Sequence, residues 1–286
     1  MDSTTDATRR PIWLCADDYG ISKSVNKAIR ELVMRGRINA TSVMVAAPSF
    51  HRSEAVSLNV LNIGMHRRVA IGLHVTLTAP FKPLSAGFRP LQEGAFLNKE
   101  QMLVRGALHL SDQRALMVEV ATQLQAFVNA FGRTPDFFDG HQHVHLFPQV
   151  REAVLRVMRE TTPKAWIRQC GRTMPFADRF ADRKGLVLDV LSHRMRQRAA
   201  AFGLATNPAF AGTYDFEAAA VPDFAALFPA FLQHLPPQSV VMCHPGFVDA
   251  ELERLDPLTT QREREYAYLA GEAFPAAMRA HGVALA

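Results

Sequence analysis

Short runs of apolar residues alternate along the chain with longer stretches in which apolar residues recur every three or four positions. The first pattern indicates buried strands and the second indicates amphipathic helices. Strands are predicted at 11–18, 39–48, 69–78, 164–170, 239–246 and 283–286, and helices at 23–37, 113–132, 148–160 and 259–282, the last one interrupted at Pro275. Residues 176–235 are predicted to be mostly helical, with a break around 212–216. This alternation is typical of an α/β protein with a mostly parallel sheet.

The length of 286 residues is large for one domain, yet α/β barrels often reach it as a single unit. No composition shift marks a linker between two domains. We therefore predict a disordered tail over residues 1–10 and one domain over residues 11–286. In a barrel of this class, functional side chains gather at the carboxyl ends of the strands.

Composition and charge exclude several classes of function. The net charge of +5 is small, and the basic segments lack the interleaved aromatic residues of a single-strand nucleic-acid groove. No apolar run is long enough to span a membrane, and the polar start lacks the core of a signal peptide. Cys15, Cys170 and Cys243 are widely spaced, which argues against a disulfide framework or a thiolate zinc site. We expect a cytoplasmic protein without nucleic-acid or membrane partners; the oligomeric state stays open, a homodimer included.

Acidic and histidine side chains stand at the ends of the apolar runs. They are Asp17 and Asp18, His74, the series Asp139, His141, His143 and His145, and His244. In an extended segment the series would share one face, with alternate residues ~7 Å apart, so that at most two could bind one ion. The others would orient ligands, bind substrate or structure the loop. Each group also has a purely structural interpretation: an Asp can cap the following helix, and a histidine can be a hydrogen-bonded core residue.

A metal-dependent hydrolase explains the whole set economically. One Asp and two histidines would hold the ion, the second Asp would take a proton from water held there, and His244 would protonate the leaving group. A metal-dependent phosphoesterase is the alternative, although it usually needs two ions and more ligands. A binding protein with a structural metal is a third hypothesis, but closed structural sites prefer four protein ligands.

Four motifs in register resemble the YdjC/ChbG-like carbohydrate deacetylases: CADDYGISKSVNKAI, IGLHVTLT, FFDGHQHVHLFP and VMCHPGFVD, with QREREYAYL near the end. The resemblance implies a single-domain, distorted (β/α) TIM-like barrel. It also implies hydrolysis of N-acetyl groups on amino sugars such as chitooligosaccharides, with one divalent metal ion, Mg or Zn.

Residue by residue, the resemblance implies Asp18, His74 and His141 as metal ligands, Asp17 as the base and His244 as the acid. The other polar residues would contact substrate or support the ligands: Asp139, His143, His145 and Arg168. Arg168 is equally compatible with a surface salt bridge. Residues 171–215 match the family weakly, so the acetylated sugar and its chain length stay undetermined.

Overall fold

A curled parallel sheet forms the centre of the molecule. The computed structural model describes residues 9–64, 69–172, 183–214 and 223–286, so the predicted tail lies outside them as far as residue 8. In this part of the chain the sheet has the strand order β5-β4-β3-β2-β1-β7-β6, and β8 pairs with the start of β1. The strands are β1 (Arg10–Tyr19), β2 (Ala40–Val43), β3 (Ala70–Val75), β4 (Phe137–Gly140), β5 (Trp166–Ile167), β6 (Phe210–Ala211), β7 (Val240–Cys243) and β8 (Val283–Leu285).

The two edges of the sheet meet near β5 and β6. Parallel bridges join Ile167 to Thr206 and Arg172 to Phe210, and the Ile167 N–H donates to the carbonyl of Ala205 at 3.0 Å. The sheet therefore curls towards closure through isolated contacts instead of a regular ladder. This arrangement confirms the predicted distorted barrel.

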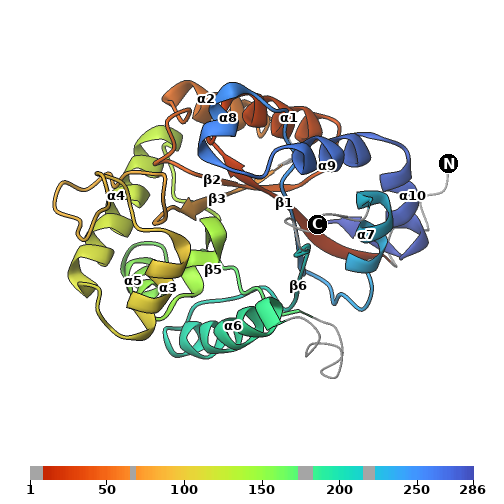
Figure 1. Cartoon of the computed structure of the whole chain (residues 1–286). Coiled ribbons are helices and arrows are strands. Elements are labelled where there is room, and N and C mark those ends of the chain that lie inside the picture. Colours follow the sequence, from red (N-terminus) through yellow and green to blue (C-terminus); the bar gives the residue numbers. More distant parts are fainter. Residues whose placement is uncertain (1–8, 65–68, 173–182, 215–222) are drawn as a thin grey trace.

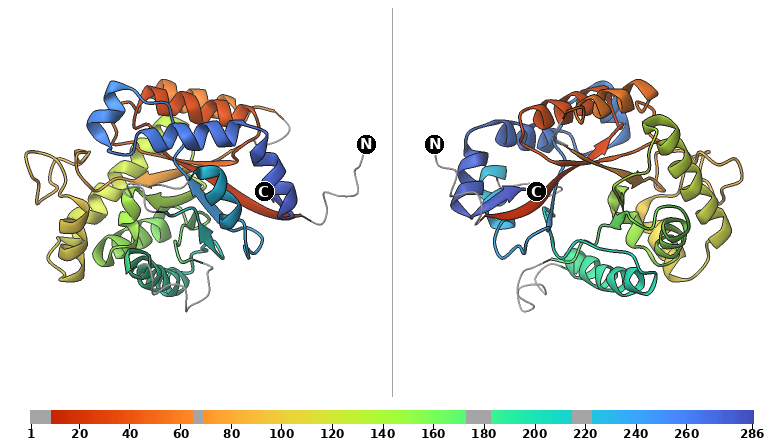
Figure 2. Two further views of the ribbon diagram at one scale, coloured as in Figure 1. Left: turned by 45° about the vertical axis from the view of Figure 1, so that its right-hand side comes forward. Right: turned by 180° about the vertical axis from the view of Figure 1, so that it is seen from behind.

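Helices surround the outside of the curled sheet (Figure 1). The view from behind shows the same ring of helices around the strands (Figure 2). They are α1 (Lys23–Met34), α2 (Arg52–Val60), α3 (Lys99–Ala107), α4 (Gln113–Phe131), α5 (Pro148–Thr161), α6 (Arg183–Ala201), α7 (Phe224–Phe231), α8 (Ala250–Leu255), α9 (Thr260–Ala270) and α10 (Ala273–Ala280). None of those described combines the length and apolar character that crossing a bilayer requires.

Most strands are buried on both faces, as expected where helices cover a parallel sheet. All residues of β2, β3, β4 and β7 are buried. Packing between neighbouring strands is close: a Cβ on Gly72 of β3 would lie 2.3 Å from a ring carbon of Phe137 in β4. The barrel is therefore a packed core that fixes the positions of its strand ends.

Some local predictions were wrong. The segment after β4 is a 3₁₀ turn, η1 (His141–Leu146), and positive φ angles of 53° at Gln142 and 58° at His143 interrupt it. The polar series from Asp139 therefore does not continue along one extended face. The predicted helix over 259–282 is two helices, separated at Gly271 instead of at Pro275, which lies in the first turn of α10 where its missing N–H costs little.

The apolar pattern also missed several short elements. Helices α2, α3 and α8 were not predicted, and strand β6 lies inside the region 176–235 that was predicted to be mostly helical. Residues 173–182 and 215–222 of that region lie outside the described residues. The missed helices span only six to nine residues and bury few side chains. Such short segments give little periodic signal.

Candidate active site

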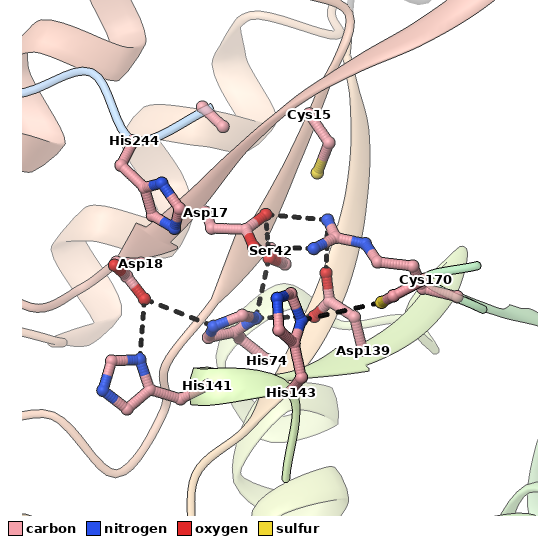
Figure 3. A network of polar contacts seen from close by, with 12 residues as sticks. Cys15, Asp17, Asp18, Ser42, His74, Asp139, His141, His143, Cys170 and His244 are labelled. Carbon is pink, nitrogen blue, oxygen red and sulfur yellow. Dashed lines mark hydrogen bonds and ion pairs between the residues drawn. The ribbon is translucent and has the colours of Figure 1, made fainter. Parts of the chain in front are cut away.

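A register irregularity at the end of β1 separates the two neighbouring carboxylates. The pairing of β1 with β2 shifts between Ala16 and Tyr19, and Asp18 has a left-handed φ of 67°. A bulge of this kind redirects side chains, and aspartate tolerates the left-handed region better than most residues. Asp17 and Asp18, both buried, consequently face different partners (Figure 3).

Asp18 lies between two histidines from neighbouring strand ends. Its Oδ1 is 3.2 Å from Nε2 of His74 on β3 and 3.0 Å from Nδ1 of His141, which follows β4. The three donor atoms lie within 4.8 Å of one another, and all three residues are buried. Ligands bound to one ion at about 2.0–2.2 Å are themselves separated by roughly 3.0–3.4 Å. The predicted trio therefore comes together and could hold a divalent metal ion, and an aspartate with two imidazoles suits several such ions.

Asp139 and Ser42 fix the orientation of the His74 ring. Its Nδ1 is 2.6 Å from Oδ1 of Asp139 and 3.0 Å from Oγ of Ser42, which leaves Nε2 facing Asp18. A carboxylate behind a histidine ligand sets the ring's tautomer and direction in many metal sites. Burial lowers the pKa of His74, but the carboxylates of Asp139, Asp18 and Asp17 raise it to about 10. Without an ion, His74 is therefore an imidazolium, and an incoming metal must displace its proton.

Asp17 is held by a buried arginine. Arg168 donates to its two carboxylate oxygens at 2.6 and 2.7 Å, and the same guanidinium lies 2.6 Å from Oδ2 of Asp139. Burial raises the pKa of Asp17, but Arg168 outweighs it and keeps this pKa well below the usual range. Asp17 is therefore ionised at neutral pH, and the hydroxyl of Ser42 also donates to its Oδ1 at 3.3 Å.

Arg168 is fully buried, so the interpretation of this residue as a surface salt bridge is wrong. Its guanidinium joins the carboxylates of Asp17 and Asp139. Asp139 in turn supports His74. Both residues thus contact the groups predicted to react or to bind metal, in line with the support role considered for them.

His244 enters the site from the turn after β7. Its backbone N–H donates to Oε2 of Glu265 at 2.5 Å, and Glu265 also accepts a hydrogen bond from the hydroxyl of Tyr214 at 2.6 Å. The imidazole is partly exposed and lies beside Asp17 (Figure 3). The structure therefore places a group able to donate a proton next to the ionised carboxylate.

The remaining two histidines of the polar series contact groups outside the metal trio. Nδ1 of His143 is 3.6 Å from Sγ of Cys170, and Nε2 of His145 is 3.0 Å from the carbonyl oxygen of Arg168. Burial lowers the pKa of His143 to about 3 and the pKa of His145 well below its usual value. Both rings are neutral, and His145 helps to fix the segment that carries Arg168.

Sequence reasoning missed three residues that contact the site. Arg262 on α9 donates to Oδ2 of Asp18 at 2.6 Å, Ser42 contacts both Asp17 and His74, and Glu265 holds the backbone of His244. Two of them lie in QREREYAYL, which matched the resemblance without an assigned role. A single arginine, glutamate or serine within a regular element carries no spacing signal. Only the resemblance of that segment could have indicated Arg262 and Glu265, and no signal indicated Ser42.

Comparisons with known proteins indicate the family of this chain. The model of the YdjC-like protein family matches residues 11–280. A chitooligosaccharide deacetylase of Salmonella newport (strain SL254) is 25% identical over 248 residues, which cover 84% of this chain and 83% of that protein. One of Escherichia fergusonii is 31% identical over 140 residues, covering 47% and 50%.

Solved structures share the fold. A protein of Enterococcus faecalis V583, named provisionally as a cellobiose-phosphate cleavage protein, superposes with a TM-score of 0.73 at 21% identity over 97% of both chains. A CE4 esterase of Streptococcus mutans gives 0.51 at 13% identity, covering 99% of this chain and 87% of the other. At these identities the similarity shows the fold alone. The family model, which spans nearly the whole chain, shows more: this protein belongs to the YdjC-like family.

Proposed function

We propose that this protein is a metal-dependent carbohydrate deacetylase that removes N-acetyl groups from amino sugars of the chitooligosaccharide type. The observation that carries the proposal is the convergence of Asp18, His74 and His141 on one point beside the ionised Asp17. The relatives named chitooligosaccharide deacetylases support the choice of substrate class.

The metal trio defined by Asp18, His74 and His141 would hold one divalent ion, Mg or Zn, which would polarise a carbonyl group and acidify water. Asp17 accepts a proton from the attacking water. Arg168 keeps its carboxylate ionised, and the hydrogen bonds from Arg168 and Ser42 fix its orientation. His244, which is partly exposed, donates a proton to the departing amine nitrogen. Asp139 keeps Nε2 of His74 turned towards Asp18.

The phosphoesterase alternative is less compatible with the charges. Two-metal sites place their ions about 3.5–4 Å apart. The neighbouring group of potential ligands is Cys15, Asp17 and Asp139, but the guanidinium of Arg168 already joins its two carboxylates. Burial also raises the pKa of the Cys15 thiol, which opposes the thiolate form that binds metals. A second cation there would meet a fixed positive charge.

The test measures acetate release from N-acetylated mono- and oligosaccharides by metal-free protein supplied with Mg, Zn, Mn or Co. We expect activity with at least one ion at a stoichiometry of one per chain, and none without metal. A His141→Ala variant should lose both the ion and the activity. Release of phosphate from phosphoesters with two ions bound, and no acetate from any sugar, would refute the proposal.

A further inference from the structure

Arg262 connects helix α9 to the candidate metal site. Its side chain is fully buried, and one terminal nitrogen lies 2.6 Å from Oδ2 of Asp18 and 3.0 Å from Oδ2 of Asp256. Its Nε donates to the carbonyl oxygen of Leu258 at 2.9 Å. The guanidinium is thus fixed by three partners, and one of them is a residue of the metal trio.

The two oxygens of Asp18 therefore have different partners. Oδ1 faces His74 and His141, whereas Oδ2 is held by Arg262. A free carboxylate can bind a metal through one oxygen or through both. We propose that Arg262 is a positioning residue that withholds Oδ2 of Asp18 from the metal, so that Asp18 binds through Oδ1 alone and the ion stays electron-poor. This inference rests on the proposed function, because it assumes that the trio binds a divalent ion.

Contacts of the α9 backbone keep Arg262 in this place. The backbone carbonyl oxygen of Arg262 accepts a hydrogen bond from the N–H of Gly246 at 3.1 Å. Gly246 lies in the turn that follows His244. A Cβ on Gly246 would lie 3.3 Å from Cδ of Arg262 and 2.9 Å from a methyl of Val25. One turn further along α9, Glu265 holds the N–H of His244. The helix is therefore anchored to the turn carrying the predicted acid while its arginine holds the predicted ligand.

Removal of the guanidinium should affect metal binding and turnover in opposite directions. A neutral side chain frees Oδ2 and removes part of the compensation for the buried charge of Asp18 in the metal-free protein. A divalent ion supplies that compensation and no longer faces a positive neighbour, so it should bind more tightly. The same extra electron donation makes the ion a weaker Lewis acid, so turnover should slow. Loss of a merely structural contact would weaken binding and activity together.

The experiment compares the full-length wild type with Arg262→Met and Arg262→Lys, with Arg262→Gln as a second neutral variant should Met give no folded protein. Arg172→Met is the matched control, because Arg172 is a largely buried arginine bonded to Asp189 outside the contacts of Asp18. The dissociation constant of Zn²⁺ is measured calorimetrically on metal-free protein against a competing chelator. Melting temperatures with and without Zn²⁺, and the rate of acetate release, are measured on the same samples.

We expect the neutral Arg262 variant to bind Zn²⁺ at least about tenfold more tightly than the wild type. Its melting temperature should rise more when Zn²⁺ is added, and its rate of acetate release should be lower. Arg262→Lys should stay near the wild type, and Arg172→Met should lose stability without a change in the dissociation constant. Equal or weaker Zn²⁺ binding by the neutral variant would overturn the inference. Failure of the wild type to bind any ion would overturn both proposals, whereas stoichiometric binding without acetate release would overturn the proposed function alone.

Discussion

The substitution Asp17→Asn removes the predicted base while keeping the size of the side chain. Arg168 donates to both carboxylate oxygens of Asp17, and an amide nitrogen in place of one oxygen would face a guanidinium N–H instead of accepting from it. Breaking a buried ion pair typically costs about 3–5 kcal/mol when the remaining charge is left alone. In the variant Arg168 still has a partner, because the carboxylate of Asp139 lies 2.6 Å from it. We therefore expect a smaller loss of folding stability, about 1–3 kcal/mol.

The effect on turnover should be much larger than the effect on folding. Removal of a general base typically lowers the rate about 10²–10⁴-fold, and the metal trio contains no atom of Asp17. We therefore expect kcat for acetate release to fall by that factor while each chain still retains one ion, measured by elemental analysis after dialysis. Asp189→Asn is the matched control, since Asp189 also accepts from a largely buried arginine and should leave kcat unchanged. A kcat for Asp17→Asn within about tenfold of the wild type would refute the base assignment.

Three further predictions follow from the charges and packing. In Arg168→Lys the pKa of Asp17 should rise, because a lysine cannot reproduce the two hydrogen bonds of the arginine. Ionised Asp17 stabilises the fold above its unfolded pKa, and this stabilisation is lost as pH falls through its folded pKa, so in the variant it should be lost at a higher pH. A shift to lower pH of the acid limb, in melting temperature or in kcat/KM, would contradict this. Metal uptake at pH 8 should release about one proton from His74, and calorimetry in buffers of different ionisation enthalpy measures this release. Protonated His74 stabilises the metal-free fold fully below about pH 6.5, and this stabilisation is lost as pH rises through about 10. Metal binding without proton release would count against the prediction. Gly72→Ala should destabilise the fold by about 1–3 kcal/mol in urea unfolding, because its Cβ would lie 2.3 Å from a ring carbon of β4, whereas Gly87→Ala meets nothing within 4 Å and should not.

Much of the fold could be predicted because a buried parallel strand is a short apolar run in the sequence. The runs over 11–18 and 69–78 contain most or all of β1 and β3, and the polar residues predicted to lie at strand ends do so. Parallel strands end at the same edge of the sheet, so Asp18 and His74 could be placed together although many residues separate them. The periodicity of α1 and α4 was equally clear, because each buries one apolar face.

The local geometry of the site was beyond the reach of periodicity. The bulge that turns Asp18 away from Asp17 and the 3₁₀ turn that follows His141 both depend on left-handed backbone conformations. Such conformations are stabilised by the surrounding structure and not by the residues themselves. Arg168 could be named from the sequence but not placed, and Arg262 could not be found, because Asp17 and Asp18, which they hold, lie more than a hundred residues away.

The balance of charge at the centre of the site favours a single ion. Three buried carboxylates, Asp17, Asp18 and Asp139, face the guanidinium groups of Arg168 and Arg262 and the imidazolium of His74. This set is close to neutral without metal, and exchange of the His74 proton for one divalent ion adds only one positive charge. A second divalent ion would add two more in a region where the carboxylates already have cationic partners, which is costly in a buried environment. The same charges that keep Asp17 ionised therefore favour one bound ion, as the proposed deacetylase requires.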